Sequence, residues 1–394
     1  MKIETSEDLR ISHVLPRISA ALDVALDQLV AQRDAFRSLF PGEHTFDGVY
    51  RPLVFPGYPE GSNVGWTNGL WTGQLWIAHE LTNDNAFRQC AEDQLPGYKR
   101  RLAQGDDLDT HDLGFLYTPS CVAAYRLTGN EQARASALAA ADALMNRYLV
   151  NAGVIQAWGD LANPVERGRI IIDCLMNLPL LYWASETTGN PDFRHAAESH
   201  ASRSREVLVR PDASTFHTFH FDPETGEEIK GTTHQGFSDA SCWARGQAWG
   251  IYGFALNHRH APQLGLLTSA IQLADYFLAH LPANGVVYWD LSFGDGSTEP
   301  WDSSASAIAV CGLLELSEQL PPGEKSSHYH ASALHILQGL IDSCSGRLPS
   351  TKALLLHGVY SKPAGRGVDE ANLWGDYFYL EALARVTHNW KPHW

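Results

Sequence analysis

The sequence of 394 residues predicts an all-α fold, an (α/α)6 barrel built from six helical hairpins. Three observations support it. Junctions that end one helix and begin another recur along the chain, and apolar residues follow the helical period between them. A single segment near residues 214–235 alternates in the manner of a short β-hairpin. Because no linker or low-complexity segment divides the chain, we expect one domain over residues 1–394.

The junctions share a pattern of turn and capping residues. They lie at Glu80–Arg88, Arg126–Arg134 and Glu186–Arg194. Gly129 and Gly189 suit the left-handed position just past a helix end. Asn130 and Asn190 suit N-caps, and Pro191 suits the first position of a helix. The spacing of about 45–60 residues is typical of stacked helical hairpins.

Helical periodicity between such junctions predicts twelve helices. They are expected at residues 12–39, 66–82, 84–104, 112–128, 131–149, 169–187, 191–209, 240–260, 264–282, 303–319, 326–344 and 370–387. Ile170–Ser185 and Ser304–Leu316 are apolar nearly all round, which predicts inner helices of a barrel. Ala133–Tyr148 and Arg194–Val209 are amphipathic, which predicts outer helices.

The predicted hairpin interrupts this helical pattern. Ser214–Phe221 alternates, Asp222–Gly226 supplies turn residues, and Glu228–Thr233 returns. In a helical barrel such an insertion is expected at a loop face, and loops on a rigid scaffold often carry the functional site.

Composition limits the partners of the protein. The formal net charge of −16 argues against a nucleic-acid partner or an anionic membrane. An acidic substrate would therefore need a local cation such as Arg245. The N-terminus lacks an apolar signal region and no apolar run reaches about 18 residues, so the sequence predicts a cytoplasmic protein.

Cysteine and histidine spacing predicts neither disulfides nor a metal site. The six cysteines are widely spaced without a C-x-x-C pair, which favours buried free thiols. His111, His217 and His234 lack the spacing of metal ligands and are interpreted as hydrogen-bonding groups. We therefore expect no metal site.

Two aspartates in apolar surroundings are candidate catalytic acids. Asp173 lies within the apolar run Ile170–Leu181, where burial would raise its pKa and keep it protonated near neutral pH. Its alternative interpretation is a buried aspartate that caps a helix or pairs with Arg169. Asp112 opens another apolar stretch, and its alternative is an ordinary N-cap. Together they suggest paired carboxylates facing one pocket.

Aromatic and cationic residues supply further candidates. Arg245 and Trp249 are four residues apart, so on a helix they could grip one ligand. The alternative is an arginine stacked on a structural tryptophan. Trp66 and Trp158 lie beside polar, glycine-containing turns and could each present a face to a sugar ring.

Five motifs in order across nearly the whole chain resemble the unsaturated glucuronyl hydrolases, glycoside hydrolase family 88. The motifs are Thr67–Gly73, His111–Phe115, Ile172–Asn177, Thr233–Gly236 and Trp243–Trp249. The resemblance implies an (α/α)6 barrel that removes the 4,5-unsaturated uronic acid from the non-reducing end of lyase-generated oligosaccharides. It also implies hydration of the C4=C5 enol ether, without metal or cofactor, in place of direct attack at C1.

The resemblance also implies roles for individual residues. Asp173 would protonate C4 and then take a proton from the attacking water, with Asp112 as its partner. The residues implied around the substrate are Trp66, His111, Trp158, His217, Gly231, Thr233, Gln235, Arg245, Trp249 and Ser361.

A partial match to the motifs of sulfate-preferring family members predicts the substrate preference. Family members that favour sulfated disaccharides carry an arginine just before the glutamine and a Ser-x-x-Ser-x-Lys loop. Here those places hold His234 and the loop Ser361–Arg366. We therefore expect unsulfated or mixed substrates.

Two alternative functions stay open from the sequence. The same barrel could hold an inverting hydrolase of saturated glycosides, in which the carboxyl pair acts on a glycosidic oxygen and a water. It could also be a non-catalytic oligosaccharide-binding protein. A desolvated acid is of little use to a binding site, which makes the second alternative the weaker one.

Overall fold

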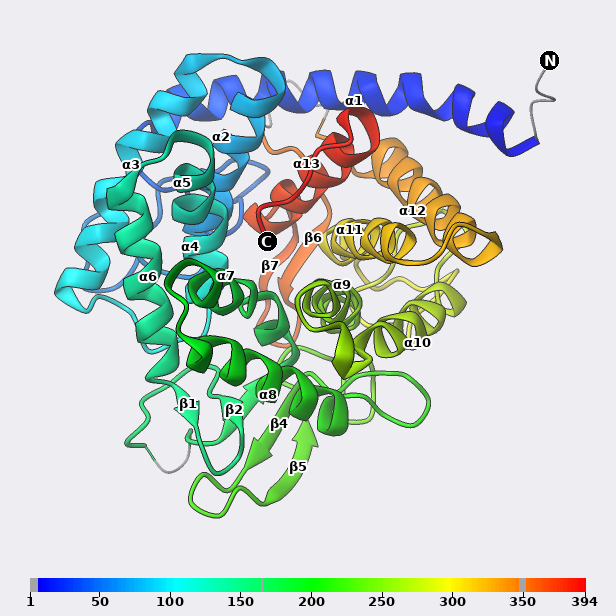
Figure 1. Ribbon diagram of the computed structural model, residues 1–394. Helices are drawn as coiled ribbons and strands as arrows, with labels where there is room; N and C mark the ends of the chain where they lie inside the picture. The colour runs from blue at the N-terminus through cyan, green and yellow to red at the C-terminus, as the bar shows by residue number, and fades with distance from the viewer. Residues whose placement is uncertain (1–5, 164–165, 347–351) are drawn as a thin grey trace.

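Twelve long helical segments dominate the computed structural model, which describes residues 6–163, 166–346 and 352–394 (Figure 1). They are α1 (Ser6–Phe36), α2 (Asn68–Thr82), α3 (Asn85–Gln104), a continuous segment of α4 (Leu113–Tyr117), the π-turn Thr118–Val122 and α5 (Ala123–Thr128), then α6 (Glu131–Met145), α7 (Pro179–Thr188), α8 (Pro191–Leu208), α9 (Ala244–His260), α10 (Leu266–Ala279), α11 (Ser303–Gln319), α12 (Glu324–Ser343) and α13 (Leu373–His388).

Every second segment belongs to a closed inner ring. α2 packs on α4, α4 on α7, α7 on α9, α9 on α11, α11 on α13, and α13 returns to α2. The remaining helices, α1, α3, α6, α8, α10 and α12, pack against the outside of this ring. The predicted (α/α)6 barrel is therefore confirmed.

Burial distinguishes the two rings in the way the periodicity predicts. α9, α11 and α13 are buried along nearly their whole length, whereas α8 and α10 bury one side only. A helix that is surrounded by neighbours can be apolar all round, while a peripheral helix keeps a polar face toward water.

The predicted helix at 169–187 is wrong in its first half. Arg169–Ile171 forms strand β3, Ile172–Met176 forms a 3₁₀ turn, and helix α7 begins only at Pro179. Three consecutive isoleucines favour extended backbone, and the strand pairs antiparallel with β4 (Thr218–Phe221). The pairing partner is about 50 residues away, so helical periodicity could not reveal it.

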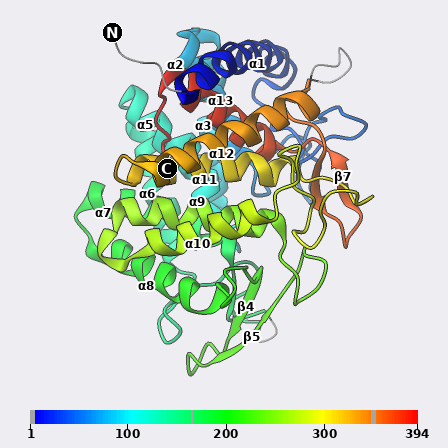
Figure 2. The same cartoon turned by 90° about the vertical axis from the view of Figure 1, so that its right-hand side faces the viewer.

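The predicted hairpin at 214–235 is confirmed and extended. β4 pairs with β5 (Glu228–Thr232), and β3 makes the sheet three-stranded. Two short hairpins were not predicted: β1 (Tyr148–Leu149) with β2 (Val154–Ile155), and β6 (Gly358–Ser361) with β7 (Arg366–Glu370). They shorten the helices expected at 131–149 and 370–387. Figure 2 shows β4, β5 and β7 toward one end of the helices, which marks that end as the loop face.

The predicted helix junctions have the expected caps. Gly129 and Gly189 adopt left-handed φ values of 69° and 75°. The side chain of Asn130 accepts a hydrogen bond from the backbone of α6, and that of Asn190 does the same for α8, where Pro191 is the first residue. Local sequence therefore determines these helix ends.

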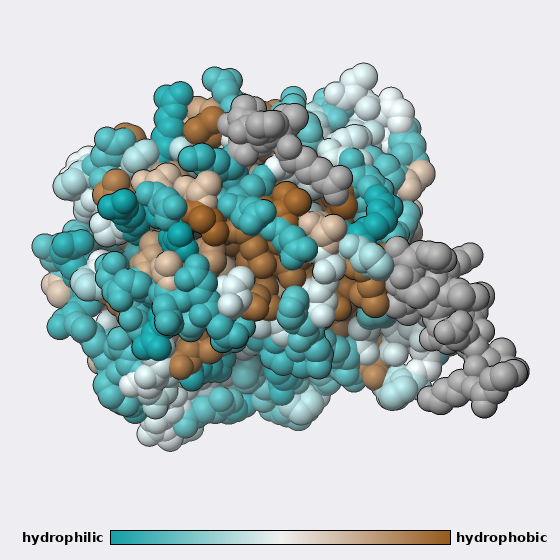
Figure 3. Space-filling model, turned by 90° about the horizontal axis from the view of Figure 1, so that it is seen from above, coloured by the Kyte–Doolittle hydropathy of each residue, from teal (hydrophilic) through white to brown (hydrophobic). Residues whose placement is uncertain are grey.

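All six cysteines are buried and free, as predicted. Within the described ranges no helix combines the length and the apolarity needed to cross a bilayer. Figure 3 shows the face seen from above, where hydrophobic residues gather in the middle and hydrophilic residues surround them.

Candidate active site

Asp112 is the N-cap residue of helix α4, but its side chain makes no capping hydrogen bond to the helix backbone. Its carboxylate accepts a hydrogen bond from the Thr110 hydroxyl at 2.7 Å and lies 3.3 Å from Nε2 of His111. Burial alone would raise the pKa of Asp112, yet the charge of His111 and the Thr110 hydroxyl hold it below its ordinary value. Asp112 thus occupies the N-cap position without a side-chain capping bond, and its lowered pKa favours the ionised carboxylate.

Asp173 lies in the 3₁₀ turn between β3 and α7, where it is half-buried. Within the described part of the chain its Oδ2 has no hydrogen-bond partner. Burial raises the pKa of Asp173 to about 7, and the negative charge of Asp112 adds to this rise against the opposing cations His111 and Arg245. Near neutral pH Asp173 can thus hold a proton that no protein acceptor engages.

The alternative pairing of Asp173 with Arg169 is not what the structure contains. The Arg169 guanidinium lies over the Trp158 ring, 4.6 Å from its centroid, and no ion pair joins it to Asp173 among the described residues. The described residues therefore do not support the alternative in which Asp173 pairs with Arg169.

Asn177 joins the two elements that carry the acids. Its Oδ1 accepts the backbone N–H of Phe115 at 2.7 Å, and its Nδ2 donates to the carbonyl of Asp173 at 3.3 Å. At Gly114 an added Cβ would lie 2.3 Å from Cα of Asn177. Glycine is needed there because the two backbones touch, which explains the pairing of the His111–Phe115 and Ile172–Asn177 motifs.

His111 is buried, and its pKa is raised above the ordinary value, which favours the charged imidazolium. Burial would lower its pKa, but the charges of Asp112 and Cys174 outweigh that effect and raise it. Conversely, burial would raise the pKa of Cys174, whereas His200 and His111 lower it to about 6. The sequence indicated Cys174 only as a buried thiol. Its partner His200 is remote in sequence, so no local pattern pointed to this cluster.

His217 is neutral and has a defined tautomer. Its Nδ1 accepts the backbone N–H groups of His234 and Gln235 at 3.1 and 3.2 Å, so the proton is on Nε2. Burial lowers its pKa well below the ordinary value, with the charge of His234 adding to the effect. The carbonyl of His217 accepts from Ile172 at 3.1 Å, which holds the ring beside the turn of Asp173.

Arg245 joins three segments around the site. It forms a 2.6 Å ion pair with buried Asp302, donates to the Gln235 side chain at 2.7 Å, and donates to two carbonyls of β6. Its guanidinium also lies over the rings of Trp243 and Trp374, 4.5 and 5.0 Å from their centroids. The alternative interpretation, an arginine stacked on a structural tryptophan, therefore holds for Arg245, but the rings are those of Trp243 and Trp374 and not that of Trp249.

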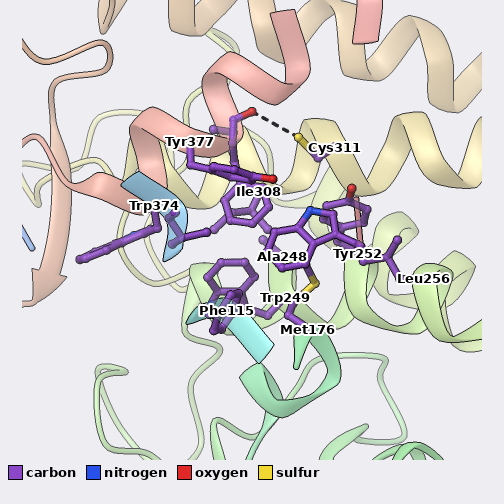
Figure 4. Packing of buried hydrophobic residues seen from close by; sticks show 14 of the residues in the cluster. Phe115, Met176, Ala248, Trp249, Tyr252, Leu256, Ile308, Cys311, Trp374 and Tyr377 are labelled. Carbon is purple, nitrogen blue, oxygen red and sulfur yellow. Dashed lines mark hydrogen bonds between the residues drawn. The ribbon is translucent and has the colours of Figure 1, made fainter. Parts of the chain in front are cut away.

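Trp249 lies deeper than the other candidate rings. It is fully buried and packs against Phe115 at 5.1 Å and Phe378 at 5.2 Å between ring centroids. Figure 4 shows its indole beside Phe115 and Met176 within the apolar core. Trp249 thus supports the helix that follows Asp112, and its direct contact with a sugar stays a prediction.

Trp66 and Trp158 are half-buried and flank the acids. Trp66 donates from Nε1 to the Tyr360 hydroxyl at 3.1 Å, and its ring lies 5.5 Å from Phe115. Trp158 pairs through its backbone with Thr110, the residue that hydrogen-bonds Asp112. Both rings are therefore positioned by residues next to the acid pair.

The remaining candidates belong to the hairpins. Gly231 lies in β5 where a Cβ would be 2.6 Å from the Phe216 ring, so packing also explains this glycine. Thr233 donates its N–H to Asp239 at 2.7 Å and accepts from Gly236 at 2.8 Å. Ser361 ends β6, the strand that holds Arg245, and is buried. Contacts of these three residues with a ligand stay predictions.

The predicted residues thus come from seven segments of the chain, and hydrogen bonds and ring contacts link many of them to one another. The arrangement offers a carboxylic acid with a pKa of about 7, a neighbouring carboxyl of lowered pKa, a neutral imidazole donor and two half-buried tryptophan rings. Such a set suits proton transfer to a weakly basic atom of a ring-shaped polar ligand.

Comparisons with known proteins agree with this geometry. Residues 54–387 match the model of Glycosyl Hydrolase Family 88. The chain is 46% identical over 379 residues, 96% of this chain and 93% of the relative, to an unsaturated chondroitin disaccharide hydrolase of Streptococcus pneumoniae. It is 45% identical to an unsaturated glucuronyl hydrolase of Bacillus sp. (strain GL1), covering 91% of this chain and 94% of that one.

Solved structures give the same result. The crystal structure of unsaturated glucuronyl hydrolase from Streptococcus agalactiae superposes with a TM-score of 0.92 at 44% identity, covering 96% of this chain and 94% of that one. An aspartate-to-asparagine variant of the same enzyme, complexed with dGlcA-GalNAc6S, superposes at 0.83 with 42% identity and coverage of 96% and 93%. The chain is an enzyme that belongs to glycoside hydrolase family 88, the unsaturated glucuronyl hydrolases.

Proposed function

We propose that the enzyme removes the 4,5-unsaturated uronic acid from the non-reducing end of lyase-generated oligosaccharides, glycosaminoglycan fragments or related chains, by hydrating the C4=C5 enol ether. The observation that carries this proposal is the free Oδ2 of Asp173 on an acid whose pKa is about 7, next to an ionised Asp112. Protonation of carbon needs such an acid in its protonated form.

The first step would be proton transfer from Asp173 to C4. Positive charge then develops at C5 and the ring oxygen, where the nearby carboxylate of Asp112 is favourable. Water adds its oxygen to C5 and gives a proton to the Asp173 carboxylate, which restores the acid. The resulting hemiketal opens, the bond from C1 to the leaving sugar breaks, and the leaving oxygen takes up a proton.

His217 and Gln235 are proposed as substrate-positioning groups. Within the described residues His217 Nε2, which carries the proton, has no protein acceptor, so it can donate to a substrate oxygen. The Gln235 side chain is oriented by Arg245, whose Nη1 and Nη2 both donate to protein acceptors. Arg245 would therefore act mainly by holding Gln235 and strand β6 in place.

We propose unsulfated or mixed substrates. Arg366, in the loop where sulfate-preferring family members carry a lysine, forms an ion pair with buried Glu43 and lies 3.9 Å over the Tyr360 ring. A neutralised cation offers little to a sulfate. The Streptococcus agalactiae complex contains dGlcA-GalNAc6S, and another neighbour is described with dGlcA-Glc-Rha-Glc, so the family takes both kinds of chain.

We also propose that the enzyme acts in the cytoplasm, without a nucleic-acid or membrane partner. Six buried free thiols and a net charge of −16 support this.

The decisive experiment follows the ultraviolet absorbance of the conjugated C4=C5 acid. Addition of the enzyme to unsaturated disaccharides that differ in linkage and sulfate position should remove the band. Sugar release from saturated glycosides would favour the inverting hydrolase instead, and tight binding without product in mass spectrometry would favour a binding protein. Persistence of the band across all substrates, with folded protein, would overturn the proposal.

A further inference from the structure

A polar pocket adjoins the candidate active site on the hairpin side. Its volume is about 390 Å³, within the range of sites that hold small ligands. Two of its lining residues, Trp158 and Thr233, also belong to the candidate active site. A third, His234, has its ring centroid 5.3 Å from that of Trp158 and 6.3 Å from that of His217. The complete lining is Trp158, Glu166, Arg169, Thr218, His220, Thr232, Thr233 and His234.

The register of the three-stranded sheet explains the pocket's character. Arg169 is directly opposite His220, and His220 is directly opposite Lys230. Opposed residues of antiparallel strands share a face, so these side chains form a row of nitrogen-bearing groups. Lys230 is exposed and continues the row beyond the pocket. In a chain of net charge −16 this row is a local reversal of sign.

Arg169 is the centre of this row. It is half-buried, and none of the ion pairs among the described residues includes it, whereas its neighbour Arg167 is paired with Glu224. Its charge lowers the pKa of both His220 and His234, after the larger effect of burial, which places it near both imidazoles. The acids in the region are Glu166, which lines the pocket, and Asp239, whose carboxylate accepts from Thr233.

We propose that this pocket binds an acidic sugar of the leaving oligosaccharide, with Arg169 meeting its carboxylate or sulfate. An arginine held over a tryptophan presents a planar fork of donors, the geometry suited to either group. The inference rests on the proposed function, because a ligand whose unsaturated end reaches Asp173 would extend past Trp158 into the pocket. The proposal places a determinant of substrate specificity on strand β3, outside the loop at residues 361–366.

The test compares leaving groups of different charge in the ultraviolet assay. One substrate is an unsaturated disaccharide with a neutral second sugar, another carries a sulfate on that sugar, and a third is an unsulfated tetrasaccharide whose third sugar is a uronate. Arg169→Gln should reduce kcat/KM about tenfold, through KM, on the sulfated disaccharide or on the tetrasaccharide. A loss on the sulfated disaccharide would identify a sulfate as the group that Arg169 binds, and a loss on the tetrasaccharide would identify a carboxylate. The neutral disaccharide should lose less than about twofold.

Two control variants test whether the effect is specific to the position and charge of Arg169. Arg167→Gln removes a neighbouring arginine outside the pocket and should leave all three substrates unaffected, while Arg169→Lys should restore part of the loss. Equal losses on neutral and acidic substrates would overturn the inference, because Arg169 would then only support Trp158. So would an unchanged KM on both acidic substrates.

A separate readout distinguishes this inference from the proposed function. Titration of the acidic and neutral oligosaccharides against Asp173→Asn protein, with and without Arg169→Gln, measures binding without turnover. Weaker binding of the acidic sugars alone supports the pocket even if no substrate is hydrated, and identical binding with either residue at position 169 overturns it.

Discussion

Asp173 is the residue on which the proposed chemistry depends, and two features of its environment raise its pKa. Burial favours the neutral acid, and Asp112, held ionised by His111 and Thr110, disfavours a second negative charge beside it. The two carboxyls therefore differ in protonation because their neighbours differ, which is the condition for assigning one as acid and the other as a charge stabiliser.

The first prediction is that Asp173→Asn abolishes turnover while binding persists. Asparagine keeps the shape but cannot give or take the proton, so kcat should fall by at least about 10³-fold. Initial rates and substrate titration measure the two effects. Asp192→Asn, on the exposed start of α8, is the matched control and should retain full activity. A kcat of Asp173→Asn within tenfold of the original would contradict the assignment.

The second prediction concerns pH. Because Asp173 must be protonated and its pKa is about 7, kcat/KM should decline above pH 7 with a limiting tenfold loss per pH unit. A rate that stays level up to pH 9 would exclude Asp173 as the acid.

The third prediction links the same pKa to stability. The folded-state pKa of Asp173 is raised from 3.8 to about 7, so its contribution to stability is complete below pH 4 and declines as pH rises to 7. Asparagine does not titrate. The free energy of unfolding of Asp173→Asn should therefore rise relative to that of the original protein by up to about 1.4 kcal/mol per pH unit over that interval, and the difference should then stay constant. Urea unfolding at several pH values measures the difference, and a gap independent of pH would contradict it.

At the element scale, the site depends on how α4 and the 3₁₀ turn after β3 fit together. The contact at Gly114 and the two hydrogen bonds of Asn177 set the separation of the elements that carry Asp112 and Asp173. Helix α7 starts only at Pro179, so the turn is free to follow β3 into the three-stranded sheet.

The fourth prediction tests this contact. In Gly114→Ala the new Cβ would lie 2.3 Å from the backbone of Asn177, so the elements must move apart. We expect a loss of about 1–3 kcal/mol in the free energy of unfolding, together with a lower kcat as the acids separate. Gly294→Ala is the control, since its Cβ meets nothing within 4 Å. Full activity of Gly114→Ala would show that the spacing is not critical.

At the scale of the whole molecule, the ring of inner helices must close, and the C-terminus contributes to closure. Figure 1 shows the chain end in the middle of the ring. Trp394 is buried, stacks on Phe378 at 5.9 Å, lies edge-on to Phe115 at 6.1 Å, and donates from Nε1 to buried Glu381 at 2.9 Å. It thereby joins α13 to the helix that follows Asp112.

The fifth prediction is that Trp394→Ala destabilises the barrel by about 3–5 kcal/mol, because it removes a large buried ring and leaves Glu381 with one donor fewer. Chemical denaturation measures the loss. Lys391→Ala, at an exposed position three residues earlier, should change stability by less than about 0.5 kcal/mol. Equal stability of the two variants would contradict this account of closure.

The sequence by itself determined the barrel and the helix junctions, and it named the two candidate acids. These features depend on local patterns: helical periodicity, Gly129–Asn130 and Gly189–Pro191 at helix ends, and a charge in an apolar run. The single-domain boundary at 1–394 and the contacts of the substrate residues stay predictions.

Only the tertiary structure decided that residues 169–176 are a strand and a turn, that Arg245 is neutralised by Asp302, and that Cys174 lies between His111 and His200. Each of these outcomes depends on a partner tens of residues away. Burial alone marked Asp173 as a candidate acid, but the value of its pKa depends on which charges the folded chain brings beside it. For this reason a local pattern could mark Asp173 as a candidate acid but could not establish its protonation state.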